Sequence, residues 1–152
     1  VIPDSLHLNK HFYKTAGAVM NPRFTLIPET TPVTTLLDHP EWSREYDHWL
    51  VEREGRVVGW ATWNGEALQH PEGLTARDLL RGGFARVSTR TRMLTALKTM
   101  DDAGASRLLV VSGEPVGPVP ASAVHGVIGP EELLTEELAD TRIFPRRDPD
   151  FL

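Results

Sequence analysis

The stretch ARVSTRTRMLTALKTMDDAGASRLLVV, residues 85–111, decides the fold of this 152-residue chain. Its centre, Thr91–Asp102, carries apolar residues at the spacing of one helix face, and Gly104 follows where a left-handed helix end favours glycine. Short apolar runs flank this helix, and another lies in GVIGPEELL, residues 126–134. Such runs between turn residues are typical of buried strands. The predicted strands are Phe84–Ser88, Ser106–Val111 and Val124–Ile128.

The first half of the chain shows the same order of elements about 60 residues earlier. Arg23–Pro28 predicts a strand, and Val33–Asp38 predicts a helix that Pro40 ends, because proline lacks a backbone donor. His48–Glu52 and Val57–Trp63 predict the two strands of a hairpin. The two halves therefore look like copies of one unit.

The copies align over two short stretches. Trp49-Leu50-Val51 aligns with Leu109-Val110-Val111, and Gly59–Thr62 aligns with Gly126–Gly129. A single unit of this size cannot bury its own sheet face, so two copies are expected to pack against each other. We therefore expect an α/β (α+β) fold of two pseudo-symmetric repeats, each a small β-sheet packed with two helices.

The connecting segments give the expected domain limits. A helix capped by Asp4 or Ser5 is predicted through residues 6–20, and Asn21-Pro22 ends it. Thr75–Leu80 predicts a helix that ends at Gly82-Gly83, and Pro130 opens a last helix through Leu138. The expected division is an N-terminal helical linker (1–20), a first repeat (21–74), a second repeat (75–140) and a C-terminal tail (141–152).

Composition excludes several classes of function. A net charge of -5 disfavours a protein that binds nucleic acid or anionic lipid, because phosphate contacts need clustered Lys and Arg. The absence of cysteine excludes disulfides, cysteine-based zinc sites and thiol catalysis. The sequence shows no signal peptide and no apolar run near the ~20 residues that a bilayer requires. The chain starts with Val1 rather than Met, as expected of a piece of a longer protein.

The stretches at residues 85–111 and 126–134 resemble a cystathionine-β-synthase-type (CBS) domain. A more divergent copy lies in FTLIPETTPVTTLL (24–37) and EYDHWLVEREGRVVGWATWNGEAL (45–68). Together the copies cover roughly residues 21–140. The resemblance implies two CBS repeats that pack as one regulatory module, which is not an enzyme.

The leading segment IPDSLHLNKHFYKTAGAVM, residues 2–20, resembles the stretch that joins the membrane part of bacterial ClC-type chloride channels and transporters to their cytoplasmic CBS pair. This resemblance implies a regulatory and dimerisation module at the cytoplasmic face of the membrane. Its expected partners are a second copy and the parent's membrane domain, without nucleic acid or direct lipid binding. The alternative is a free-standing or differently attached CBS pair that senses adenine nucleotides.

In CBS pairs that bind nucleotides, a Gly-hydrophobic-hydrophobic-Thr-x-x-Asp segment contacts phosphate through Thr and ribose hydroxyls through Asp. The first copy here keeps Thr62 but has Gly65 in place of Asp. The second copy has Gly129 in place of Thr and Glu132 in place of Asp. The resemblance therefore makes Thr62 and Glu132 candidate binding residues for ATP, ADP or AMP.

Three further candidates follow from ClC-type members that bind ATP. Tyr46 occupies the position of a Tyr that stacks near adenine, Asp47 stands beside it, and Ile27 ends the first strand, where backbone groups could face the base. The alternative is a degenerate cleft in which Tyr46 is packing and Glu132 is an acid at a helix start. Because neither copy has the intact pair, we expect weak or absent affinity for ATP and AMP.

Other candidate sites have weaker support in the sequence. His7 and His11 have the four-residue spacing of helical metal ligands but no evident third ligand, so no metal site is expected. The dipeptide Asp47-His48 comes without a nucleophile-elbow motif, so no catalytic residue is predicted. Trp60 and Trp63 fall on opposite faces of a strand, so we expect one to enter the core and the other to face a partner surface, or both to fill the core between the repeats.

Overall fold

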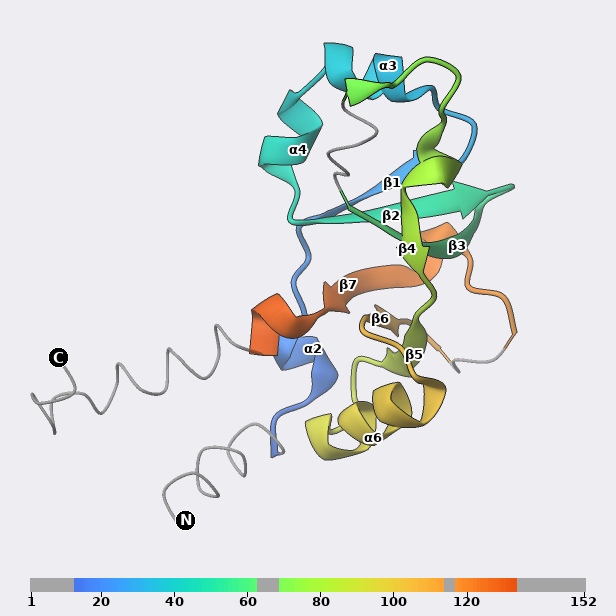
Figure 1. Cartoon of the computed structure of the whole chain (residues 1–152). Helices are drawn as coiled ribbons and strands as arrows, with labels where there is room; N and C mark the ends of the chain where they lie inside the picture. The colour runs from blue at the N-terminus through green and yellow to red at the C-terminus, as the bar shows by residue number, and fades with distance from the viewer. Residues whose placement is uncertain (1–12, 63–68, 114–116, 134–152) are drawn as a thin grey trace, which may run out of the picture.

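The computed structural model describes residues 13–62, 69–113 and 117–133 and contains two β-sheets (Figure 1). In the first sheet the strand order is β1-β2-β3-β4, with β1 and β2 parallel and the other pairs antiparallel. In the second sheet the order is β5-β6-β7, again with a parallel pair followed by an antiparallel pair. The strands are β1 (Phe24–Pro28), β2 (His48–Arg53), β3 (Arg56–Ala61), β4 (Leu80–Gly82), β5 (Ala85–Ser88), β6 (Leu108–Val111) and β7 (Val124–Ile128).

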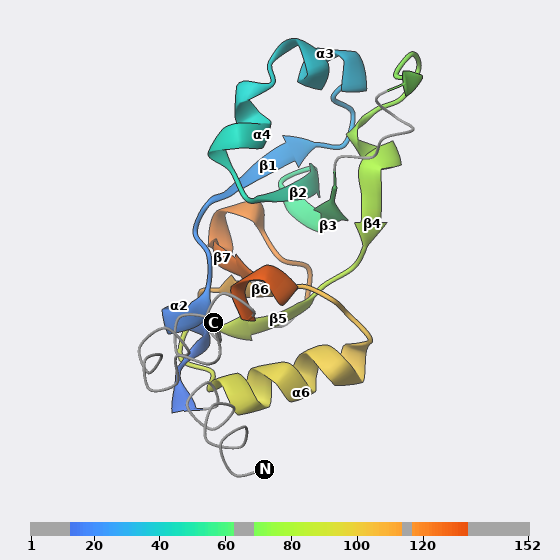
Figure 2. The ribbon, with the colours of Figure 1, turned by 60° about the vertical axis from the view of Figure 1, so that its left-hand side comes forward.

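Helices cover the outer face of each sheet, which gives four layers (Figure 2). The helices α3 and α4 lie on the side of the first sheet, while α2 and α6 lie on the side of the second. The predicted mixed α/β fold with two small sheets is confirmed. The helices are α2 (Ala16–Val19), α3 (Val33–Asp38), α4 (Glu41–Glu45), the 3-10 turn η1 (Ala76–Leu79), α6 (Met93–Ala103) and the 3-10 turn η2 (Ala121–Ala123).

The inner faces of the two sheets pack against each other in an apolar layer that we call the seam. Leu50 on β2 and Leu109 on β6 are fully buried there, whereas their neighbours Val51 and Val110 face the helices. This alternation follows from strand geometry, because successive side chains point to opposite faces. The buried seam residues are Leu50, Val57, Leu109, Val111, Val119, Val124 and Val127.

The registers reveal the internal symmetry. Ile27 lies opposite Val51 in the first parallel pair, and Val87 lies opposite Val110 in the second. Val51 therefore corresponds to Val110, and the residues before them, Leu50 and Leu109, correspond at the seam. The sequence alignment of Leu50 with Val110 was wrong by one residue, because it placed a seam residue opposite a helix-facing one.

The alignment of the next strand is confirmed. Gly59 lies opposite Val51, and Gly126 lies opposite Val110. A Cβ on Gly59 would come within 2.6 Å of the Gly82 carbonyl oxygen, and a Cβ on Gly126 would come within 2.8 Å of Met20. Both positions therefore need glycine so that another segment can approach the strand.

The two segments that approach these glycines, residues 16–20 and 76–82, each precede one repeat in the chain but pack against the other repeat. Ala16 and Val19 pack into the core beneath α6, and the Ala16 amide donates to the Thr91 carbonyl at 2.7 Å. Sixty residues later, Ala76 packs beneath α3 and its amide donates to the Thr31 carbonyl at 2.8 Å. Each repeat's leading segment thus belongs to the core of the other repeat.

This exchange changes how the expected domain limits are understood. The described part of the expected linker, residues 13–20, packs into the second repeat rather than standing apart. Residues 76–82, assigned to the second repeat by sequence, pack on the first repeat and supply its edge strand β4. The sequence period is real, but a cut between residues 74 and 75 does not separate two packing units.

Most of the predicted elements are confirmed in the described residues. The helix α6 ends at Gly104, whose φ of 64° is the left-handed cap conformation. Three details differ from expectation. Gly82 lies in β4 instead of ending a helix, and the helix α4 follows Pro40, where no helix was predicted. The predicted N-terminal helix is interrupted at Thr15, whose backbone is extended. The predictions for Trp63, His7 and His11 fall outside the described residues, as does the C-terminal tail.

We predict that Leu109→Ala lowers the free energy of unfolding by about 3 kcal/mol, because it removes a fully buried side chain and leaves a cavity in the seam. Urea denaturation followed by far-ultraviolet circular dichroism measures the change. Leu94→Ala is the matched control, since Leu94 is 50% exposed on α6, and it should cost below about 1 kcal/mol. Equal losses in the two variants would contradict a core centred on the seam.

Candidate functional site

Buried polar side chains gather at one end of the seam. His48 is 5% exposed and Arg107 is 9% exposed, and they are the buried polar or charged residues of the described chain. They occupy equivalent positions in the two hairpins. His48 precedes Trp49, which pairs with the last residue of β3, and Arg107 precedes Leu108, which pairs with the last residue of β7. The two repeats therefore bring one basic side chain each to the same end of the seam.

Glu132 of the second repeat contacts His48 and Asn21 of the first repeat. Its carboxylate lies 2.7 Å from His48 Nε2, and its side chain is only 9% exposed. The same oxygen accepts a hydrogen bond from the Asn21 side-chain amide at 3.1 Å, and the other oxygen accepts from the Gly129 backbone amide at 2.6 Å. We call His48, Glu132, Asn21, Arg107 and Glu131 the polar end of the seam.

The environment of Glu132 favours its charged form. Burial acts to raise the pKa of this carboxyl, but the hydrogen bonds from His48, Asn21 and the Gly129 amide outweigh burial and hold the pKa below its ordinary value of 4.5. A carboxylate that accepts several hydrogen bonds is stabilised as an anion. The contact between the repeats is therefore a charge-assisted one.

Arg107 completes the polar end from the second repeat. Its guanidinium carbon lies 4.1 Å from the ring centre of Trp60, which comes from the first repeat, and its NH2 group lies 3.3 Å from Glu131. A cation over an aromatic face is attracted by the ring's electron density. The indole N–H of Trp60 is buried and has no hydrogen-bond partner in the part of the chain that the structure describes.

The structure brings together two of the predicted nucleotide-binding residues, Asp47 and Glu132. Asn21 donates one hydrogen bond to Asp47 at 3.0 Å and another to Glu132, so it joins these two carboxylates. Tyr46 precedes Asp47 in the chain and caps the end of α4, and Thr62 follows the last residue of β3. Asp47 is half-exposed and also pairs with Arg23 at 3.3 Å.

Ile27 does not belong to this site. It lies three residues along β1 from Phe24, which is the register partner of His48, and this separation corresponds to about 10 Å. Its side chain is buried on the helix-facing side of the first sheet. Ile27 therefore lies at the other end of the parallel pair from His48, and its expected backbone contact with the base stays a prediction.

Sequence reasoning misses the basic residues of the site. It places His48 at the start of a strand without a role in the site and does not single out Arg107, although each immediately precedes an apolar strand run. The signal is a basic residue at the same position of both repeats, and it becomes visible only when the strand registers align the repeats.

His48, Glu131 and Glu132 also have the composition of a metal site, since their donor atoms all lie within 4.8 Å of one another. These donors are already engaged by Asn21, the Gly129 amide and Arg107. A cation entering here would have to compete with the Arg107 guanidinium for the Glu131 carboxylate. The arrangement therefore suits an anion beside Arg107 better than a metal ion.

No protein-family model matches the chain, and no curated protein matches it. Solved structures do match it over most of its length. The CBS domain of the bacterial CNNM/CorC family Mg²⁺ transporter in complex with ATP has a TM-score of 0.64 and 17% identity, and the match covers 88% of this chain and 94% of that one. The chain has the fold of a CBS-domain pair.

Two further solved structures agree with this assignment. The CBS-domain-containing hemolysin-like protein of Oenococcus oeni PSU matches with a TM-score of 0.62 at 14% identity, over 87% of this chain and 96% of that one. The cytosolic domain of the Mg²⁺ channel MgtE in complex with ATP matches with a TM-score of 0.57 at 18% identity, over 86% of this chain and 51% of that one. These matches carry the CBS-pair fold but not the resemblance to ClC-type proteins.

None of the helices within residues 13–62, 69–113 and 117–133 has the length and apolar character needed to cross a bilayer.

We predict that Glu132→Gln reduces the free energy of unfolding at pH 7 by about 1–3 kcal/mol, the usual cost of losing a charged hydrogen bond. The pKa of Glu132 is lowered by folding, so its stabilisation is complete above about pH 4.5 and is lost as pH falls through the folded pKa. The gap between wild type and variant should therefore narrow below pH 4.5. Urea denaturation at about pH 7, 5 and 3.5 measures it, and a constant gap would contradict the assignment.

Proposed function

We propose that this chain is a regulatory module of a membrane transport protein and that it senses an adenine nucleotide at the polar end of the seam. The observation that carries the proposal is the convergence of two buried basic side chains, one carboxylate and one aromatic face at the contact between the repeats. Both the CNNM/CorC CBS domain and the MgtE cytosolic domain were solved in complex with ATP.

Each part of a nucleotide has a chemical counterpart in this site. The guanidinium of Arg107 and the imidazole of His48 can hold phosphate oxygens, and Arg suits bidentate binding of phosphate. The carboxylate of Glu132 can accept hydrogen bonds from ribose hydroxyls. Trp60 offers an aromatic face and a buried N–H that has no protein partner among the described residues.

The same contacts explain how binding would act on the protein. Glu132 uses both of its oxygens within the module, so a nucleotide has to replace the contacts from His48 and Asn21. Those contacts join the two repeats, and replacing them changes how the repeats meet. A ligand that binds one arrangement better than the other shifts the population between them. The need to open the site also lowers the apparent affinity.

The missing Thr-Asp pair predicts weak affinity for ATP. We predict that ATP still binds the wild-type chain weakly and that Arg107→Met raises its dissociation constant at least about tenfold, because a charged contact to phosphate is worth roughly 1.5–3 kcal/mol. Isothermal titration calorimetry at fixed ionic strength measures the constant. Glu132→Gln should also weaken ATP, but it should weaken AMP by the same factor, because both ligands carry the ribose.

Lys98→Met is the matched control, since Lys98 is an exposed cation on α6, outside the seam. It should leave ATP affinity within about twofold of wild type. Equal weakening by Lys98→Met and Arg107→Met would mean that ATP responds only to net charge. Absence of any heat or competition by ATP would refute nucleotide sensing at the seam.

We propose attachment to a ClC-type membrane domain on the strength of the leading segment alone, with a differently attached or free-standing CBS pair as the alternative. The role is proposed to be regulatory rather than catalytic, with a second copy and the membrane domain as partners at the cytoplasmic face. The gene sequence upstream of Val1 separates these cases: about ten membrane helices there support the ClC attachment, and an initiator Met close to Val1 refutes it. Sedimentation equilibrium tests the proposed homodimer.

A further inference from the structure

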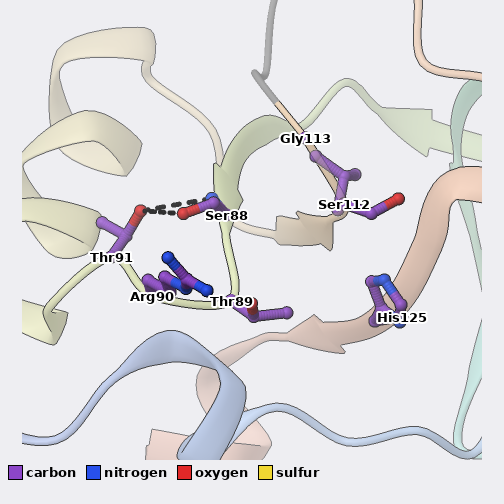
Figure 3. Close-up of a pocket in the computed structure, with 8 residues that line it drawn as sticks. Ser88, Thr89, Arg90, Thr91, Ser112, Gly113 and His125 are labelled. Carbon is purple, nitrogen blue, oxygen red and sulfur yellow. Dashed lines mark hydrogen bonds between the residues drawn. The ribbon is translucent and has the colours of Figure 1, made fainter.

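A hollow of about 540 Å³ lies at the end of the second sheet away from the polar end of the seam (Figure 3). It sits where the parallel strands β5 and β6 end, between the loop that leads to α6 and the loop that follows β6. Arg107 precedes β6 and Val111 ends it, so four residues, or about 13 Å of strand, separate this hollow from the polar end of the seam.

The side chains around the hollow are suited to an oxyanion. Four of them carry hydroxyls, one is a guanidinium and one an imidazole, and none of the described lining residues carries a carboxylate. Figure 3 shows the loop with Thr89 and Arg90 on one side and Ser112 with His125 across from it. The polar lining residues are Ser88, Thr89, Arg90, Thr91, Ser112 and His125.

The loop of residues 88–92, which forms one wall of the hollow, is held by hydrogen bonds from residues 16 and 17. The carbonyls of Thr89 and Thr91 accept hydrogen bonds from the Gly17 and Ala16 amides of the exchanged leading segment, at 2.9 Å and 2.7 Å. The hydroxyl of Thr91 contacts both the Ser88 amide and the Ser88 hydroxyl. With its carbonyls engaged from behind, the loop is preorganised for a ligand on its hydroxyl side.

The first repeat provides an internal comparison. By the strand registers, the residue equivalent to Thr89 is Glu29, and the residue equivalent to Ser112 is Arg53. These two residues of the first repeat form a bidentate ion pair with contacts of 2.6 Å and 3.0 Å. The first repeat thus supplies its own anion at this place. The second repeat lacks that carboxylate and carries the cation Arg90 where the first repeat has the neutral Thr30.

We propose that this hollow binds the phosphate group of a small phosphorylated molecule, in the place that Glu29 fills in the first repeat. The hydroxyls donate to the phosphate oxygens and Arg90 balances their charge. The site is separate from the nucleotide site proposed at the seam, and the proposal depends only on the residues that line this hollow.

The test is a titration of the ¹⁵N-labelled chain with inorganic phosphate, against sodium chloride at matched ionic strength, followed by amide chemical shifts. Saturable shifts should concentrate at Ser88–Thr91, Ser112 and Gly113. Shifts confined to the polar end of the seam, near Gly129 and Glu132, would overturn the proposal, as would shifts that grow linearly without saturation.

Two pairs of variants sharpen this test. Thr89→Glu places in the second repeat the carboxylate of the first, and it should reduce phosphate affinity at least about tenfold, whereas Thr89→Ser keeps the hydroxyl and should retain affinity within about twofold. Arg90→Glu should weaken phosphate at least about fivefold, and Arg81→Glu, an equal charge change on the exposed edge strand β4, should not. Equal weakening by Arg90→Glu and Arg81→Glu would overturn the proposal. A dispersed spectrum for each variant confirms folding.

Discussion

Each sheet of this protein has one apolar face that its own helices cannot cover, and burial of these two faces against each other organises the rest of the structure. Leu50 and Leu109 reach the centre of the contact from equivalent positions on β2 and β6. Burying a side chain of this size contributes about 1.5–3 kcal/mol. Neither repeat could retain that contribution alone, so the two are required together.

The polar end of the seam departs from this apolar rule in a way that points to function. Polar groups cost free energy when buried unless they are paired, and Glu132 meets that cost with hydrogen bonds from His48, Asn21 and Gly129. These contacts are drawn from both sides of the junction. The buried contact between Glu132 and His48 thus lies where the two repeats meet. A ligand that replaces this contact there acts directly on the arrangement of the repeats.

The sequence is sufficient for the layered fold because local patterns and packing agree there. The spacing of Met93, Leu97 and Met100 predicts α6, and the apolar run before Val111 predicts β6. Strand β4 escapes prediction, because its pairing depends on the close approach that Gly59 allows and not on any pattern of its own. The basic residues of the site escape it for a related reason: His48 and Arg107 are far apart in the chain, and only the strand registers show that they are equivalent.

The exchanged leading segments have a mechanical consequence. Ala16 lies before the first repeat in the chain, but it packs in the core of the second repeat. Ala76 lies before the strands of the second repeat, but it packs in the core of the first. Tension arriving along the chain from the N-terminal side is therefore transmitted to the later repeat, which is anchored by the amides of Ala16 and Gly17 on the loop before α6. Because each repeat holds a segment that leads into the other, a displacement of one repeat pulls on the core of the other.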